Sequence, residues 1–183
     1  MHRLLAIGLL VLSTSALAGY KPGPQDPTAQ LVVDAQSDST GTTMSVVYAS
    51  ANADEKCAPS KRGFRLGGDS TSGHTPAIKP VRIVANELFA FTASYNEARG
   101  GQNRACSVTA AFMPAADHRY LARIVTTNQV ERCDLAVFDV TDGKARSIDF
   151  HMPEFVCGKK SPTRLPNGKP VIIPGVILIP GFY

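Results

Sequence analysis

Short runs of β-forming residues, broken by Gly, Pro, Asn and Asp, are the feature of this sequence that most constrains its fold. No stretch of helical length has a sustained three-to-four-residue apolar rhythm, so the pattern does not favour helices. Short strands separated by frequent turn signals are typical of an all-β domain. The expected strands cover residues 30–35, 43–49, 81–84, 88–95, 106–113, 119–127, 133–140 and 144–152.

The strands from residue 81 onward have the clearest patterns. In 88–95 the odd positions Phe89, Phe91 and Tyr95 form an aromatic face, and such a face predicts contact with the core. The run 133–140 is apolar on both faces, which is typical of a central strand.

A tight turn is expected between the last two strands. The pair Asp142-Gly143 stands between two apolar runs, and this pair predicts a two-residue hairpin turn because glycine tolerates the positive φ required. Past the turn, Ile148, Phe150 and Met152 alternate with polar residues. This alternation predicts a strand with one buried face and one wet face.

The stretch AFMPAADHRY, residues 111–120, places Asp117, His118, Arg119 and Tyr120 side by side. Pro114 cannot donate to a strand ladder, and the residues after it favour a turn. We interpret the stretch as a β-hairpin with a polar tip, with Arg119 and Arg123 on the exposed face. Adjacent residues of a strand point to opposite faces, so Asp117 and His118 are not expected to form a catalytic dyad.

The first residues predict export. A basic start is followed by an apolar run at 4–12 and by small residues at Ala16 and Ala18, as in a cleavable signal peptide. The apolar run is shorter than the about 20 residues that span a bilayer, so the mature chain is expected in the periplasm or the medium. The expected division is a signal peptide at 1–18, a loose Pro/Gly-rich leader at 19–29, a β-sandwich domain at 30–157 and an apolar, Pro/Gly-punctuated tail at 158–183.

Four cysteines, Cys57, Cys106, Cys133 and Cys157, lie in the expected mature chain. An even number of cysteines in an exported chain predicts disulfides, and four cysteines allow three pairings. None of them forms a Cys-x-x-Cys motif, so neither a redox centre nor a zinc knuckle is indicated.

Charge and motifs argue against several function classes. The formal net charge of +4 is spread along the chain, whereas nucleic-acid binding requires a concentrated basic face with aromatic residues. His74, His118 and His151 lack the spacing of metal ligands, and the segment GGDSTSG lacks the second glycine of a nucleophile elbow. We therefore predict no catalytic residue, no metal site and no cofactor.

The end of the chain is the predicted interaction surface. The sequence KPVIIPGVILIPGFY is apolar and interrupted by two Pro-Gly pairs, which argue against a helix or a central strand. It is expected to be an edge strand or an exposed apolar surface for another envelope protein. The residues of this surface are Val171, Ile172, Ile173, Val176, Ile177, Leu178, Ile179, Phe182 and Tyr183.

The run VRIVANELFAF, Cys106, Phe112-Met113-Pro114, Tyr120 and CDLAVFDV resemble small exported β-sandwich proteins of proteobacteria over residues 81–140. The resemblance implies a compact, disulfide-bearing sandwich of the envelope, with no catalytic residues to transfer. It favours a Cys106–Cys133 bridge, which leaves Cys57 with Cys157. A simple meander argues otherwise, because next-nearest strands lie about 9–10 Å apart. A bulge, or a division of the strands between two sheets, would remove the conflict.

The expected fold is an antiparallel β-sandwich, two-sheet and of the immunoglobulin or transthyretin type, stapled by disulfides. The expected function is that of an exported, non-catalytic protein-binding or structural module. One alternative is a binder of small ligands or cell-wall polymer that uses the loop 66–76 with Arg119 and Arg123. The other is a hydrolase whose site is assembled from residues far apart in sequence.

Overall fold

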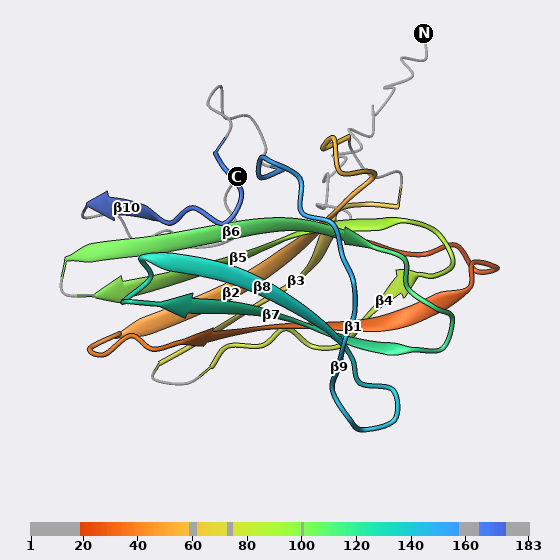
Figure 1. Cartoon of the computed structure of the whole chain (residues 1–183), viewed down its shortest axis with the longest axis horizontal. Coiled ribbons are helices and arrows are strands. Elements are labelled where there is room, and N and C mark those ends of the chain that lie inside the picture. Colours follow the sequence, from red (N-terminus) through yellow and green to blue (C-terminus); the bar gives the residue numbers. More distant parts are fainter. Residues whose placement is uncertain (1–18, 59–61, 73–74, 100, 158–164, 175–183) are drawn as a thin grey trace, which may run out of the picture.

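The computed structural model describes residues 19–58, 62–72, 75–99, 101–157 and 165–174. Its strands form two five-stranded sheets packed face to face (Figure 1), so the all-β, two-sheet fold is confirmed. The strands are β1 (Thr28–Ser37), β2 (Met44–Asn52), β3 (Arg65–Thr71), β4 (Val81–Val84), β5 (Phe89–Arg99), β6 (Gln102–Phe112), β7 (Arg119–Thr127), β8 (Arg132–Asp139), β9 (Arg146–Ser147) and β10 (Val171–Pro174).

One sheet has the strand order β4-β1-β7-β8-β9, and the other has the order β10-β6-β5-β2-β3. We call them the β1 sheet and the β5 sheet. Their strand pairs are antiparallel except for β1 and β7, which run parallel from Gln30↔Arg119 to Ser37↔Thr126. The sandwich is thus antiparallel apart from this one pair, which the sequence did not predict because local pattern does not reveal which distant strands meet.

The core between the sheets is rich in aromatic rings. Phe89 and Phe91 on β5 and Phe112 on β6 are buried, and the ring centroid of Phe112 lies 5.0 Å from that of Tyr120 on β7. Edge-to-face pairs of this kind add about 0.5–1.5 kcal/mol beyond the area they bury. The aromatic face predicted for 88–95 therefore faces the core, as expected.

The segment 113–118 is not a hairpin turn. β6 belongs to the β5 sheet and β7 to the β1 sheet, so this connection crosses from one sheet to the other. The hydroxyl of Tyr120 accepts a hydrogen bond from the Ala115 N–H at 2.9 Å and fixes the crossing. The hairpin prediction for 111–120 is wrong because a strand–turn–strand pattern does not show whether the two strands share a sheet.

The segment 66–76, expected as a flexible loop, contains most of β3. Leu66 is buried in the core. A Cβ atom on Gly67 would lie 3.4 Å from the Cβ of Ile78, so Ile78 packs directly against this strand. Glycine and small polar residues weaken the sequence signal of a strand, and here they conceal an edge strand.

The connection between β8 and β9 is longer than expected. Asp139 pairs with Arg146, so residues 140–145 form the loop in place of a two-residue turn. Gly143 has the positive φ expected of it, at 77°. β9 is only two residues long, although Phe150 beyond it still packs against the core. In β8 the buried residues alternate with exposed or half-buried ones, so only one of its faces is buried.

The segment 19–29, expected to be a loose leader, is tied to the sandwich. The Tyr20 N–H donates to the Arg65 carbonyl at 2.9 Å. The Tyr20 ring lies 5.7 Å from that of Phe89, and its hydroxyl accepts the Val84 N–H at 3.3 Å. This tyrosine therefore closes the gap between the edges of the two sheets.

The two disulfides are Cys106–Cys133 and Cys57–Cys157, the pairing that the resemblance favours. Cys106 on β6 is bonded to Cys133 on β8, with Cα atoms 6.3 Å apart, and this bridge joins the two sheets. Cys57 is bonded to Cys157 with Cα atoms 5.0 Å apart. The division of the strands between two sheets removes the conflict that a single meander would create.

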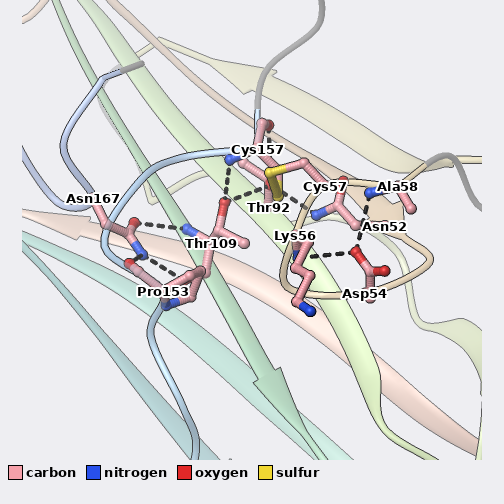
Figure 2. The surroundings of a disulfide bond; sticks show 10 residues. All are labelled: Asn52, Asp54, Lys56, Cys57, Ala58, Thr92, Thr109, Pro153, Cys157 and Asn167. Carbon is pink, nitrogen blue, oxygen red and sulfur yellow. Dashed lines mark hydrogen bonds between the residues drawn. A yellow bond between two sulfur atoms is a disulfide. The ribbon is translucent and has the colours of Figure 1, made fainter.

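The Cys57–Cys157 disulfide holds the backbone at Cys157 against the outer face of the β5 sheet (Figure 2). The Cys157 N–H donates to the Thr109 hydroxyl at 2.8 Å, and that hydroxyl lies 2.8 Å from the hydroxyl of Thr92. Both threonines are buried. These contacts satisfy polar groups that point out of the sheet but do not reach water.

Asn167 replaces a missing strand neighbour along the outer edge of β6. Its side-chain amide accepts the Thr109 N–H at 2.8 Å and donates to the Thr109 carbonyl at 2.8 Å and to the Pro153 carbonyl at 2.7 Å (Figure 2). β10 covers the start of the same edge, and His151 pairs with its end at Ala111. Asn167 and β10 therefore belong to the sandwich, although they lie beyond Cys157 in the sequence.

Replacement of Asn167 by alanine is expected to lower the free energy of unfolding by about 2–3 kcal/mol. The change leaves the amide and carbonyl of Thr109 without partners, and each buried unpaired group costs about 1–3 kcal/mol. Urea denaturation measures the effect. Gln36→Ala, at an exposed amide on β1, is the control and should change the free energy by less than about 0.5 kcal/mol.

Candidate functional site at one end of the sandwich

His118 is paired with Asp139, not with its neighbour Asp117. The Nδ1 atom of His118 lies 2.6 Å from Oδ2 of Asp139, whereas Asp117 is exposed with a φ of 64°. Thr141 donates its N–H and its hydroxyl to the other oxygen of Asp139, at 2.8 and 2.6 Å. The hydrogen bonds among His118, Asp139 and Thr141 hold the segment that crosses between the sheets against the end of β8.

These hydrogen bonds predict acid sensitivity. Partial burial opposes ionisation of Asp139, but the hydrogen bonds from Thr141 and His118 outweigh it and lower the pKa from 3.8 to about 2. Because the pKa of Asp139 is lower in the folded chain, ionised Asp139 contributes fully to the free energy of unfolding at a pH above its unfolded-state pKa. This contribution is lost as the pH falls from about 4 to about 2. Asp139→Asn should flatten that part of the stability profile, which denaturation at a series of pH values measures. An unchanged profile would contradict the assignment.

The two arginines that the sequence placed on an exposed face have internal partners. Arg123 forms a bidentate pair with Asp34 on the neighbouring strand, at 2.9 Å from Nε and 2.7 Å from Nη2. The hydrogen bond to Asp34 raises the pKa of the Arg123 guanidinium. Arg119 donates to the Thr141 carbonyl at 2.6 Å. Both cations therefore stabilise the β1 sheet and are not free ligand contacts.

Other ionisable residues of the chain do not join this group. Glu131 and Asp134 are exposed, and His151 lies 3.3 Å from Glu55 in a separate, exposed pair. His74 lies outside the described residues. Within the described part of the chain, no group of three His, Cys, Asp or Glu side chains could hold a metal ion.

The predicted interaction surface is only partly described. Val171, Ile172 and Ile173 lie on β10, which pairs with the start of β6 as an edge strand. The Ile172 side chain is 57% exposed. Its remaining residues, Val176, Ile177, Leu178, Ile179, Phe182 and Tyr183, lie outside the described residues.

Three connections meet at one end of the sandwich and form the strongest candidate site, which we call the loop end. They are residues 38–43 between β1 and β2, residues 99 and 101–104 where β5 ends and β6 begins, and residues 128–131 between β7 and β8. Figure 1 shows the turns of these strand pairs on the same side of the molecule. Sequence reasoning missed this site.

The β7–β8 turn is strained. Asn128, Gln129 and Val130 have consecutive φ angles of 51°, 60° and 65°, which lie in the left-handed region. That conformation costs a residue other than glycine about 1–2 kcal/mol. A β-branched valine rarely adopts it, yet Val130 is held there with its side chain buried.

Neighbouring connections clamp the strained turn in place. The Asp38 carboxylate accepts the N–H groups of Asn128 and Gln129 at 2.9 and 3.1 Å. Arg99 donates to the side-chain oxygen of Gln129 at 2.9 Å, and Arg104 donates to the Gln129 carbonyl. Four hydrogen bonds from the two neighbouring connections therefore hold the turn and present its exposed side chains in one geometry.

The buried carboxylate of Glu97 anchors the loop that carries Asp38. Glu97 has no exposed side-chain surface. Its oxygens accept hydrogen bonds from the hydroxyls of Ser39 at 2.9 Å, Tyr95 at 3.1 Å, Thr42 at 3.3 Å and Ser37 at 3.5 Å. These hydroxyls come from β5 and from the end of β1 with its following loop, so Glu97 ties the loop 38–43 to the β5 sheet.

The electrostatics around Glu97 are not optimised for stability. Burial and the nearby carboxylate raise the pKa of Tyr95 to about 12, so it remains a hydrogen-bond donor. The Nε atom of Arg99 lies 3.8 Å from Glu97. Among the described residues, the Nε atom of Arg104 and the hydroxyl of Thr126 are buried without a hydrogen-bond partner. Strain and unpaired polar groups together are typical of functional sites.

The strain predicts a stability difference between two variants at Gln129. Gln129→Ala and Gln129→Gly both remove the contact to Arg99, but only glycine relaxes at positive φ. We expect the glycine variant to unfold with a free energy about 1 kcal/mol higher than the alanine variant. Guanidinium denaturation of the pair measures this difference, and equal values would contradict the strain.

One sequence signal could have found part of the site. The aromatic face of β5 uses odd positions, so the same parity places Glu97 inside the core, where a carboxylate needs several partners. The polar run from Ser37 to Thr43 could supply them. The left-handed turn has no such signal, because only Asn128 is a residue that favours positive φ.

A scan against known family models finds no match for the chain, and a comparison with curated proteins finds none either. Within the described residues no helix is long and apolar enough to cross a membrane. The resemblance to exported proteobacterial β-sandwich proteins therefore stays a prediction.

Proposed function

We propose that this chain is an exported, non-catalytic protein-binding module of the bacterial envelope that uses the loop end as its binding surface. The observation that carries the proposal is the left-handed turn at Asn128, Gln129 and Val130. Strain in a non-glycine turn persists only where the surroundings hold it, and such strain concentrates at ligand clamps and other functional sites.

The architecture suits this role. Binding residues are often placed on loops that a rigid scaffold positions, and here Asp38, Arg99 and Arg104 fix the turn before any partner arrives. A turn that is already ordered loses little conformational entropy on binding, which favours affinity. Export is supported by the signal-peptide pattern at 1–18 and by the two disulfides, which persist in oxidising compartments.

The test compares turn variants in a binding assay. The mature chain is immobilised and incubated with envelope extract under oxidising conditions. Asn128→Ala/Gln129→Ala is expected to reduce the retained protein at least about tenfold, since a few central side chains carry most binding energy. Asp142→Ala/Lys144→Ala changes the exposed turn at the other end of β8 and should retain the partner normally. Equal retention by both variants would refute the loop end as the binding surface.

The apolar tail remains a second proposed surface of the same function. A truncation after Cys157 would also remove Asn167 and β10, which complete the edge of β6. A chain that stops after Pro174 lacks residues 175–183 and keeps both Asn167 and β10. If this shorter chain folds normally but loses the partner, the tail contributes to docking; if it retains the partner in full, it does not.

A further inference from the structure

The two edges of the β5 sheet differ in how far other segments cover their backbone hydrogen-bonding groups. The outer edge of β6 is covered along its length by β10, by Asn167 and by His151. At the opposite edge, within the described residues, no backbone hydrogen bond reaches the outer side of β3 from Gly67 to Thr71. Edge strands offer unpaired N–H and C=O groups to another chain, so proteins usually cover or blunt them.

The start of β3 already pairs with an extended segment. The N–H groups of Tyr20 and Lys21 donate to the carbonyls of Arg65 and Arg62, at 2.9 and 2.8 Å, and Gly19 forms a parallel bridge with Arg65. Among the residues that the structure describes, the edge therefore pairs with an extended segment at one end and has no backbone partner on its outer side from Gly67 to Thr71.

A basic pocket adjoins that open edge. It has a volume of about 400 Å³ and is lined by Tyr20, Lys21, Pro22, Leu66, Val81 and Arg82. Lys21 and Arg82 are exposed. In the described part of the chain neither has a carboxylate partner, and the Arg82 guanidinium contacts only the Thr28 hydroxyl at 3.3–3.4 Å. The apolar walls and two cations suit an apolar side chain next to a carboxylate.

We propose that the β3 edge and this basic pocket form one docking site for an extended, acidic segment of a partner protein. The segment adds a strand to the β5 sheet beside Gly67–Thr71, so main-chain hydrogen bonds supply affinity. Its acidic end reaches Lys21 and Arg82, and that contact sets its direction and register. Asp69 lies farther along the edge, so a carboxylate is favoured at the pocket end and disfavoured beyond it. The site is a further surface, separate from the apolar tail and independent of the turn at 128–130.

Synthetic peptides of roughly nine residues, the length of a strand, test this site. The probe pairs an alternating Thr-Val run with a Glu-Leu-Glu end, and it is prepared in both sequence directions with a fluorescent label. Fluorescence anisotropy should show saturable binding of one direction to the mature chain. The same peptide with Lys in place of Glu should bind at least about tenfold more weakly. Absence of binding by either acidic peptide at millimolar concentration would overturn the proposal.

Two matched charge reversals separate the pocket from general charge. Lys21→Glu/Arg82→Glu should weaken the acidic peptide at least about tenfold. Lys144→Glu/Lys169→Glu alters two exposed lysines outside the pocket and gives the same net charge, so it should bind almost normally. Equal weakening in both variants would overturn the pocket as the contact.

Strand addition has its own readout. Peptide binding should slow hydrogen exchange of the amides at 67–71. Two further peptides carry N-methyl groups on either the odd or the even amides, and the one whose methylated amides face β3 should not bind. If these amides are already slow to exchange in the free protein, or if both N-methylated peptides bind normally, the edge is not the docking strand.

Discussion

Replacement of Glu97 by alanine is expected to lower the free energy of unfolding by about 3–5 kcal/mol, the range for breaking a buried ionic network. The carboxylate is fully buried and accepts hydrogen bonds from four hydroxyls. Its loss leaves those hydroxyls and the nearby Arg99 without their shared acceptor. Thermal and urea denaturation of the mature chain under oxidising conditions measure the effect.

The matched control is Glu131→Ala, at an exposed carboxylate next to the turn at 128–130. This change should alter the free energy of unfolding by less than about 0.5 kcal/mol. Hydrogen exchange in the loop 38–43 should also accelerate in Glu97→Ala, since the carboxylate anchors that loop. A cost of less than about 1 kcal/mol for Glu97→Ala would show that the network does not hold the loop end together.

Removal of the Cys57–Cys157 bridge is expected to have a comparably large effect. The bonded residues are 100 positions apart, and closing a loop of that size stabilises a chain by about 4.7 kcal/mol in the chain-entropy treatment. The double variant Cys57→Ala/Cys157→Ala should therefore lose about 4–5 kcal/mol in guanidinium denaturation.

The second bridge is the comparison. Cys106 and Cys133 are 27 positions apart, which corresponds to about 3.6 kcal/mol. Both cysteines are buried, so their replacement by alanine also removes core contacts of about 1 kcal/mol. The two double variants should thus lose similar free energies for different reasons. A loss of less than about 1 kcal/mol from either one would contradict this account.

Part of the fold could be predicted because its signals are local. β4 and β7 have the limits expected from their β-branched, alternating residues. The aromatic face of β5 follows from the two-residue period of a strand. Glycine at position 143 adopts the positive φ that its turn requires.

The rest depends on which distant segments meet, and local pattern does not contain that information. The strand–turn–strand pattern around Pro114 is the same for a hairpin and for a crossing between sheets. β3 was missed because an edge strand of Gly67, Gly68 and small polar residues needs its neighbours to form. Tyr20 was missed because its Pro/Gly-rich surroundings conceal one residue that packs well.

The candidate site shows the same limit. Glu97 could have been found from the inward parity of its strand, but its hydroxyl partners come from loops whose paths the sequence does not define. The strained turn at Asn128, Gln129 and Val130 contradicts local preference, which is why its propensities did not reveal it. Local and global preferences conflict most at functional sites.

The most direct measurement applies the Gln129→Ala and Gln129→Gly pair to partner retention and unfolding together. Both variants lack the glutamine side chain, so their difference isolates the held backbone conformation. The glycine variant is expected to be the more stable by about 1 kcal/mol but to retain less partner, because its turn is no longer held in one geometry. If glycine binds as well as alanine or better, the strained turn does not serve binding and the central claim is contradicted.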